Sequence, residues 1–146
     1  MSAPSLPLDL ARLLAFVRVI LLNRLDCDII TFESASSGRM DLEAIGKTIA
    51  PDKKIGIGVI DHHTLQIERP EEVADHIRAA LKFIPVERLV ISTDCGMGRE
   101  GMTRRHAFFK MVALVLGTNI VRHELGLPQA ECRAADKRYA FSAPAR

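Results

Sequence analysis

The stretch IGIGVIDHH, residues 55–63, decides the fold that we expect for this chain. Its first six residues are apolar side chains or glycines, without the polar alternation of a half-exposed strand, and Asp61 follows them directly. Continuous apolar runs of this length are typical of strands that are buried on both faces of a parallel sheet. Residues 55–60 are therefore predicted to form such a strand.

Two similar runs lie on either side of this strand. DIITF, residues 28–32, comes before it, and LVIS, residues 89–92, comes after it. Segments that are expected to be helical surround the three strands, at residues 10–25, 40–48 and 70–84 and in a long final segment that begins near Thr103. The final helix is expected to kink around Gly117. Strands that alternate with amphipathic helices predict the α/β class, with parallel strands and covering helices.

Composition places the chain among soluble globular proteins. It has 146 residues, of which 48% are hydrophobic and 26% charged, and a formal net charge of +2. This near balance, with only 5% aromatic residues, predicts no surface for nucleic acid. The apolar residues 10–22 fall short of the roughly 20 residues of a membrane span, so no membrane association is expected. The three cysteines have no C-x-x-C spacing, which favours reduced thiols and a cytoplasmic location.

Chemically reactive side chains follow each predicted strand. Glu33 follows the first strand, Asp61 and His63 follow the second, and Asp94 and Cys95 follow the third. The carboxyl ends of parallel strands meet at one edge of a sheet, where α/β proteins build their sites. Three such strand ends in succession predict one functional site at this edge.

The runs DIITFES, GVIDHHT and ERLVISTDCG, which begin at residues 28, 58 and 87, resemble the catalytic barrel of the cobalamin-independent methionine synthase family (5-methyltetrahydropteroyltriglutamate–homocysteine methyltransferases). The resemblance covers roughly residues 22–128. It implies a partial TIM (β/α)8 barrel made of the last three β/α units, with residues 1–128 as the barrel portion and 129–146 as a C-terminal tail. It also implies zinc-dependent methyl transfer from 5-methyltetrahydrofolate, as its polyglutamate, to homocysteine, which gives methionine.

The same resemblance implies roles for individual residues. Glu33 and Cys95 fall on zinc ligands of the family, and His63 falls on its proton donor. Asp61 is expected either to orient His63 or to contact substrate, whereas His62 is expected to point to the other side of the strand. Zinc would deprotonate the acceptor thiol, and a protonated imidazole would assist departure of the folate amine.

One departure from the family pattern limits this assignment. The family takes its other two zinc ligands from a His-x-Cys motif on an earlier strand, and the sequence contains no His-x-Cys. A complete barrel takes about 250 residues. The resemblance therefore implies that this chain supplies part of the site, with a polypeptide carrying the missing barrel strands as its partner. With two ligands of its own, the chain alone is expected to bind zinc weakly and to lack methyl transfer.

Several alternatives stay open. Three β/α units leave open sheet edges, which favours a truncated, catalytically inactive fragment, and a related zinc thiol alkyltransferase would use a different acceptor. Cys95 could be a buried structural thiol, Glu33 a loop carboxylate and His63 an ordinary histidine. Residues 96–101 match G-x-G-x-x-G, but no further strand follows, so a flexible turn is expected in place of a dinucleotide site.

Overall fold

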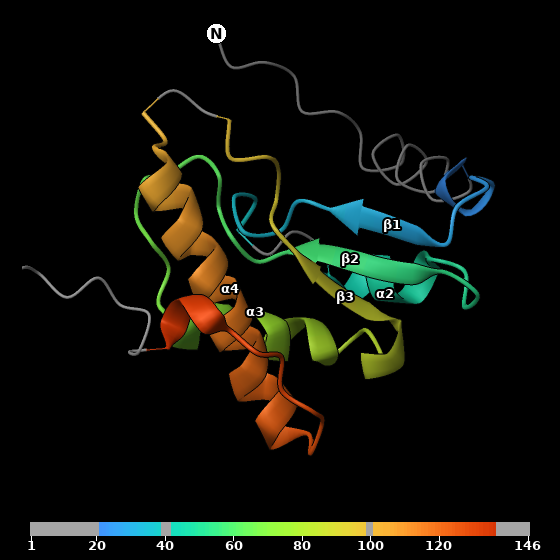
Figure 1. Ribbon diagram of the computed structural model, residues 1–146. Coiled ribbons are helices and arrows are strands. Elements are labelled where there is room, and N and C mark those ends of the chain that lie inside the picture. Colours follow the sequence, from blue (N-terminus) through green and yellow to red (C-terminus); the bar gives the residue numbers. More distant parts are fainter. Residues whose placement is uncertain (1–20, 39–41, 99–100, 137–146) are drawn as a thin grey trace, which may run out of the picture.

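The computed structural model describes residues 21–38, 42–98 and 101–136 of the chain. It contains a three-stranded parallel sheet in the order β1-β2-β3 (Figure 1). The strands are β1 (Ile29–Phe32), β2 (Lys54–Gly58) and β3 (Leu89–Ser92). The predicted α/β class with parallel strands is confirmed. The predicted helix at residues 10–25 and the turn at residues 96–101 lie partly outside the described residues.

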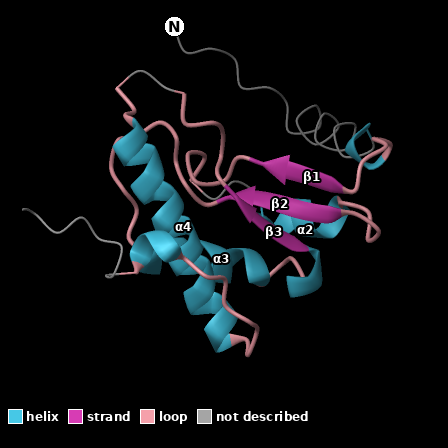
Figure 2. Cartoon of the chain, viewed as in Figure 1, coloured by secondary structure: helices cyan, strands magenta, loops and turns pink. Residues whose placement is uncertain are grey.

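The helices begin where local signals predict them (Figure 2). α3 starts at Pro70 and carries Glu71 and Glu72 in its first turn, where the helix dipole favours negative charge. α4 starts after Thr103, whose hydroxyl accepts a hydrogen bond from the His106 backbone N–H. The helices are α2 (Leu42–Thr48), α3 (Pro70–Leu81) and α4 (Arg104–Glu124), with 3-10 turns η1 (Val86–Arg88) and η2 (Arg133–Ala135).

The central strand β2 is buried on both faces, as the sequence predicts. Ile55 and Ile57 are fully buried and join one hydrophobic core with Val73 of α3. The two-residue period of a strand places Gly56 and Gly58 on the opposite face. A Cβ atom on Gly58 would lie 2.6 Å from the Cα atom of Asp94, so glycine is required where the chain after β3 crosses the end of β2.

A glycine in the middle of α4 allows close packing of two helices. α4 runs unbroken through Gly117, where the sequence predicts a kink. A Cβ atom on Gly117 would lie 2.5 Å from the Val73 Cβ atom and 2.6 Å from the Pro70 carbonyl oxygen. Gly117 therefore brings α4 into direct contact with the first turn of α3.

We expect Gly117→Ala to lower the free energy of unfolding by about 1–3 kcal/mol, because the added methyl group meets backbone that cannot move aside. This loss is net of the roughly 1 kcal/mol that alanine gains over glycine in helix propensity. Urea unfolding followed by circular dichroism measures it. Gly98→Ala is the matched control, since a Cβ atom there meets nothing within 4 Å. Unchanged or increased stability of Gly117→Ala would contradict the close helix contact.

The segment after α4 is held by the side chain of Asn119. Its Nδ2 donates a hydrogen bond to the Ala130 carbonyl oxygen at 2.7 Å, and its Oδ1 accepts one from the Ala130 N–H at 2.8 Å. These two hydrogen bonds hold the segment at residues 128–130 against α4. Over the described part of the chain, no helix combines the length and hydropathy needed to cross a lipid bilayer.

Candidate active site

The carboxyl ends of the three strands bring together the two predicted metal ligands. Glu33 follows β1 and Cys95 follows β3, on either side of β2. A Glu33 carboxylate oxygen, a ring nitrogen of His62 and the Cys95 sulfur all lie within 4.8 Å of one another. Both Glu33 and Cys95 are exposed, which does not fit a buried structural thiol at Cys95.

The expectation for His62 is wrong. Strand alternation would turn its side chain away from the site, but β2 ends at Gly58 and His62 lies in a turn. The two-residue period therefore does not apply at this position. The resulting set of one oxygen, one nitrogen and one sulfur donor matches the ligand types that zinc takes in proteins.

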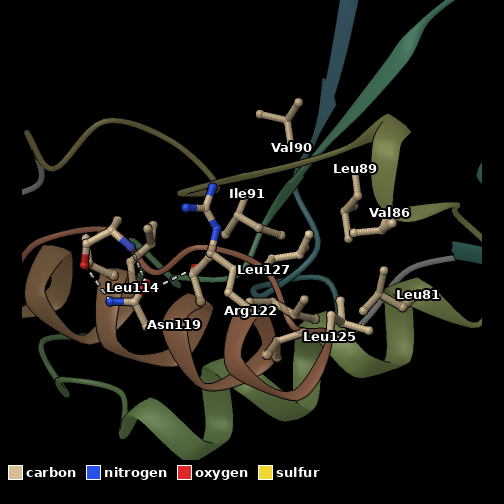
Figure 3. Close-up of a pocket in the computed structure, with 15 residues that line it drawn as sticks. Leu81, Val86, Leu89, Val90, Ile91, Leu114, Asn119, Arg122, Leu125 and Leu127 are labelled. Atoms are coloured by element: carbon tan, nitrogen blue, oxygen red, sulfur yellow. Dashed lines mark hydrogen bonds between the residues drawn. The ribbon is translucent and has the colours of Figure 1, made fainter.

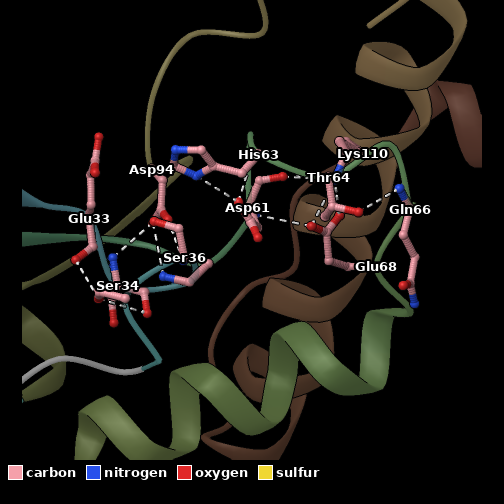
Figure 4. A network of polar contacts seen from close by, with 12 residues as sticks. Glu33, Ser34, Ser36, Asp61, His63, Thr64, Gln66, Glu68, Asp94 and Lys110 are labelled. Carbon is pink, nitrogen blue, oxygen red and sulfur yellow. Dashed lines mark hydrogen bonds and ion pairs between the residues drawn. The ribbon is translucent and has the colours of Figure 1, made fainter. Parts of the chain in front are cut away.

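His63 is oriented by the carboxylate of Asp61 (Figure 4). Asp61 Oδ1 accepts a hydrogen bond from the His63 backbone N–H at 2.7 Å and lies 3.2 Å from the His63 ring Nδ1. The His63 side chain is about half exposed, at 47%. Because Nδ1 faces the carboxylate, Nε2 is the nitrogen available to another molecule. This geometry is the one expected if Asp61 orients His63.

Asp94 joins the loop after β1 to the loop after β3. Its Oδ1 accepts hydrogen bonds from the backbone N–H groups of Ser34 at 2.8 Å and Ala35 at 3.0 Å, and its Oδ2 accepts one from Ser36 at 2.6 Å. Burial raises the pKa of the Asp94 carboxyl, but the hydrogen bonds from Ser36, Ala35 and Ser34 outweigh it and hold the pKa below its ordinary value. The ionised Asp94 carboxylate therefore binds the loop that follows Glu33. Because Asp94 directly precedes Cys95, this contact holds Glu33 and Cys95 near each other.

A buried ion pair holds the turn that carries the histidines. Lys110, whose side chain is fully buried, donates hydrogen bonds from Nζ to Glu68 Oε1 and to the Asp61 carbonyl oxygen, both at 2.9 Å. Glu68 Oε1 in turn accepts a hydrogen bond from the Asp61 N–H at 3.0 Å. Both backbone polar groups of Asp61 are thus bound by this pair (Figure 4).

These supporting residues were missed by sequence reasoning. Lys110 stands in the apolar run FFKMVALVLG, residues 108–117, and a lone cation in such a run was the available signal for a buried ion pair. His76 gives no such signal. It lies on α3, buried, with its Nε2 at 2.8 Å from the Ser34 hydroxyl, and so ties the loop after β1 to the helix layer.

Comparison with known proteins agrees with this architecture. A family model described as cobalamin-independent synthase, catalytic domain, matches residues 15–115. A methionine synthase of Saccharolobus islandicus is 41% identical over 104 residues, which are 71% of this chain and 30% of that protein. A methionine synthase of Thermococcus kodakarensis is 41% identical over 93 residues, 64% of this chain and 26% of that protein.

A solved structure shows the same relationship. The B12-independent methionine synthase from Shewanella sp. W3-18-1, in complex with selenomethionine, matches with a TM-score of 0.65 and 37% sequence identity, over 73% of this chain and 30% of that one. The chain thus spans about 30% of the length of these relatives. Because the family match extends over more than half of the sequence and includes every strand-end residue described above, the chain belongs to the cobalamin-independent methionine synthase family.

Proposed function

We propose that this chain supplies part of the active site for zinc-dependent methyl transfer from 5-methyltetrahydrofolate to homocysteine, with methionine as the product. The observation that carries the proposal is the approach of the Glu33 carboxylate and the Cys95 sulfur to within 4.8 Å, although β2 separates their strands. Family membership supports the reaction type. The matched segment covers 30% of these relatives, so the proposal requires the other barrel units to join this segment from a separate polypeptide or from a longer form of the chain.

The residues of this chain would hold the metal at the edge of the sheet. Glu33 offers an oxygen donor and Cys95 a sulfur donor, both exposed and therefore accessible to an ion and to substrate. Zinc, when bound, supplies the acceptor thiol as a thiolate, which is the reactive form. The exposed position also leaves room for donors from the missing strands.

His63 would supply the proton that methyl transfer requires. The bond between N5 of the folate and the methyl carbon breaks, a sulfur–methyl bond forms, and N5 takes up a proton. A protonated His63 can deliver that proton from Nε2, because Asp61 holds the ring through Nδ1. The Asp61 carboxylate also stabilises the charged ring through a charge-assisted hydrogen bond.

A partner that carries the rest of the barrel would cover the free edges of β1 and β3. Among the described residues β3 pairs only with β2, which leaves its other edge open. An apolar cavity of about 450 Å³ borders this strand, lined by Leu89 and Ile91 of β3 and by Leu114 and Leu125 (Figure 3). Such a surface suits the helix and strand of a neighbouring β/α unit.

A chimeric enzyme tests the proposal. In the Saccharolobus islandicus relative, the matched segment is replaced by the corresponding residues of this chain, and methionine formation from homocysteine is measured. We expect turnover in the chimera, and a fall in kcat of about 10²–10⁴-fold in its His63→Gln form, because removing a general acid typically costs that much. Cys95→Ala should reduce both bound zinc and turnover.

Lys47→Ala serves as the control for the chimera, since Lys47 lies within the matched segment and is exposed on α2. It should leave the rate unchanged. A folded chimera that binds zinc but whose rate is unaffected by His63→Gln would overturn the assignment of the proton donor. A folded chimera in which Cys95→Ala leaves zinc content and turnover intact would overturn the proposed site itself.

A further inference from the structure

We propose that His62 is a third metal ligand, so that Glu33, His62 and Cys95 give this chain a three-donor zinc site even without a partner. The inference rests on the proposed function, because it concerns the same metal, but it adds a donor that the family pattern does not assign to this position. It also changes the behaviour expected of the chain alone.

The geometry of the three donors carries the proposal. They come from the loops that follow three different strands and lie within 4.8 Å of one another. Around a tetrahedral zinc ion, with bonds of about 2.0–2.3 Å, neighbouring ligand atoms lie roughly 3.5 Å apart. Closing the difference takes about 1 Å of side-chain rotation, which the exposed Glu33 and Cys95 are free to make. Three protein ligands with one open position are the usual composition of a catalytic zinc site.

The imidazole of His62 has a polar atom without a partner. Its Nδ1 is shielded from solvent and makes no hydrogen bond to any residue that the structure describes. The neighbouring His63 contacts Asp61, and His76 contacts Ser34, so their rings are held by protein groups. Buried polar atoms are rarely left unsatisfied, and each such atom calls for an explanation such as an ion. The His62 ring contacts the His63 ring, but its Nδ1 has no hydrogen bond to a described residue that a metal would have to displace.

A competing set of donors shares the same ring. Atoms of Asp61, His62 and His63 also lie within 4.8 Å of one another. However, Asp61 Oδ1 already accepts a hydrogen bond from the His63 backbone N–H and faces the His63 ring Nδ1, so a metal would compete with these contacts for both atoms. The Glu33 set has no such cost and includes sulfur, the softest zinc donor available here. The two sets are therefore distinguished by whether sulfur binds the metal.

The consequence is measurable on the full 146-residue chain without any partner. Two ligands predict weak zinc binding, whereas three predict a stoichiometric complex with one sulfur and one imidazole in the coordination shell. The chain is stripped with a chelator, titrated with Zn²⁺ against a chromophoric competitor, and examined by zinc X-ray absorption. Mutation of groups that only support a metal ligand costs about 10–100-fold in affinity. We expect His62→Ala to weaken binding at least 10-fold and to remove the imidazole signal from the absorption spectrum.

The matched control is His123→Ala, which should leave both the affinity and the spectrum unchanged. Circular dichroism of the metal-free proteins establishes that each variant is folded, and His62→Gln provides a second variant of similar size. If Cys95→Ala and Glu33→Gln weaken zinc binding while both His62 variants leave it intact, the third ligand is overturned and the proposed function stands. If none of the four substitutions affects binding, both fall. Zinc bound without sulfur, or no uptake of zinc at all, also overturns the three-donor site.

Discussion

Lys110→Met is expected to lower the free energy of unfolding by about 3–5 kcal/mol, because it leaves a carboxylate buried without its cation. The Lys110 side chain is 0% exposed and its partner Glu68 is 16% exposed, so water cannot replace the lost ammonium group. The same substitution removes the hydrogen bond from Lys110 to the Asp61 carbonyl oxygen. The turn that presents His62 and His63 should loosen as a result. Urea unfolding measures the stability, and amide hydrogen exchange at residues 61–63 measures the local effect.

Two comparisons make this prediction specific. Lys47→Met breaks an exposed pair with Glu43 and should change stability by less than about 1 kcal/mol. The double variant Lys110→Met with Glu68→Gln removes the uncompensated charge while keeping an oxygen for the Asp61 N–H, so it should recover part of the loss. A single Lys110→Met variant that is as stable as Lys47→Met would show that the pair does not hold the fold.

Asp94→Asn is the second substitution with a large expected effect, a loss of about 2–4 kcal/mol in the free energy of unfolding. Asparagine keeps one oxygen for the N–H groups of Ser34 and Ala35, but its Nδ2 faces the Ser36 N–H, which then loses its acceptor. The charge that strengthened all three hydrogen bonds is also lost. Asp94 directly precedes Cys95 and binds the loop that follows Glu33. We therefore expect Asp94→Asn to lower the affinity for zinc as well as the stability.

The pH dependence of this effect has a defined sign. The pKa of Asp94 is lower in the folded protein than its ordinary value of about 3.9. The ionised carboxylate therefore makes its full contribution to stability above the ordinary pKa. That contribution is lost as the pH falls through the pKa that Asp94 has in the folded protein. The stabilities of the parent chain and Asp94→Asn should therefore converge at acid pH, in metal-free protein. Asp75→Asn, at an exposed position, is the control and should show little difference at any pH. A constant difference between parent and Asp94→Asn down to low pH would contradict the role of the ionised carboxylate.

The order and type of the elements follow from local patterns. The run at residues 55–60 is continuous and apolar, and it forms the strand that is buried on both faces. Pro70 and Thr103 mark the beginnings of α3 and α4, because a proline in the first turn and a capping hydroxyl act on their own helix ends. The meeting of Glu33 and Cys95 was also predictable, since residues that follow parallel strands must share one edge of the sheet.

The surroundings of the site could not be predicted in the same way. His62 faces Glu33 and Cys95 because β2 ends at Gly58 and the following residues form a turn. Where a strand ends depends on its pairing with the neighbouring strands, which the local sequence does not specify. Asp94 accepts hydrogen bonds from Ser34, Ala35 and Ser36, about 60 positions earlier in the chain. Lys110 of α4 reaches Glu68 in the loop before α3. No local periodicity encodes such contacts, because they exist only once the loops and helices have packed. Composition and spacing therefore specify the helices and strands and which strand ends meet. The direction of each side chain at the carboxyl edge of the sheet depends instead on long-range hydrogen bonds between loops and helices.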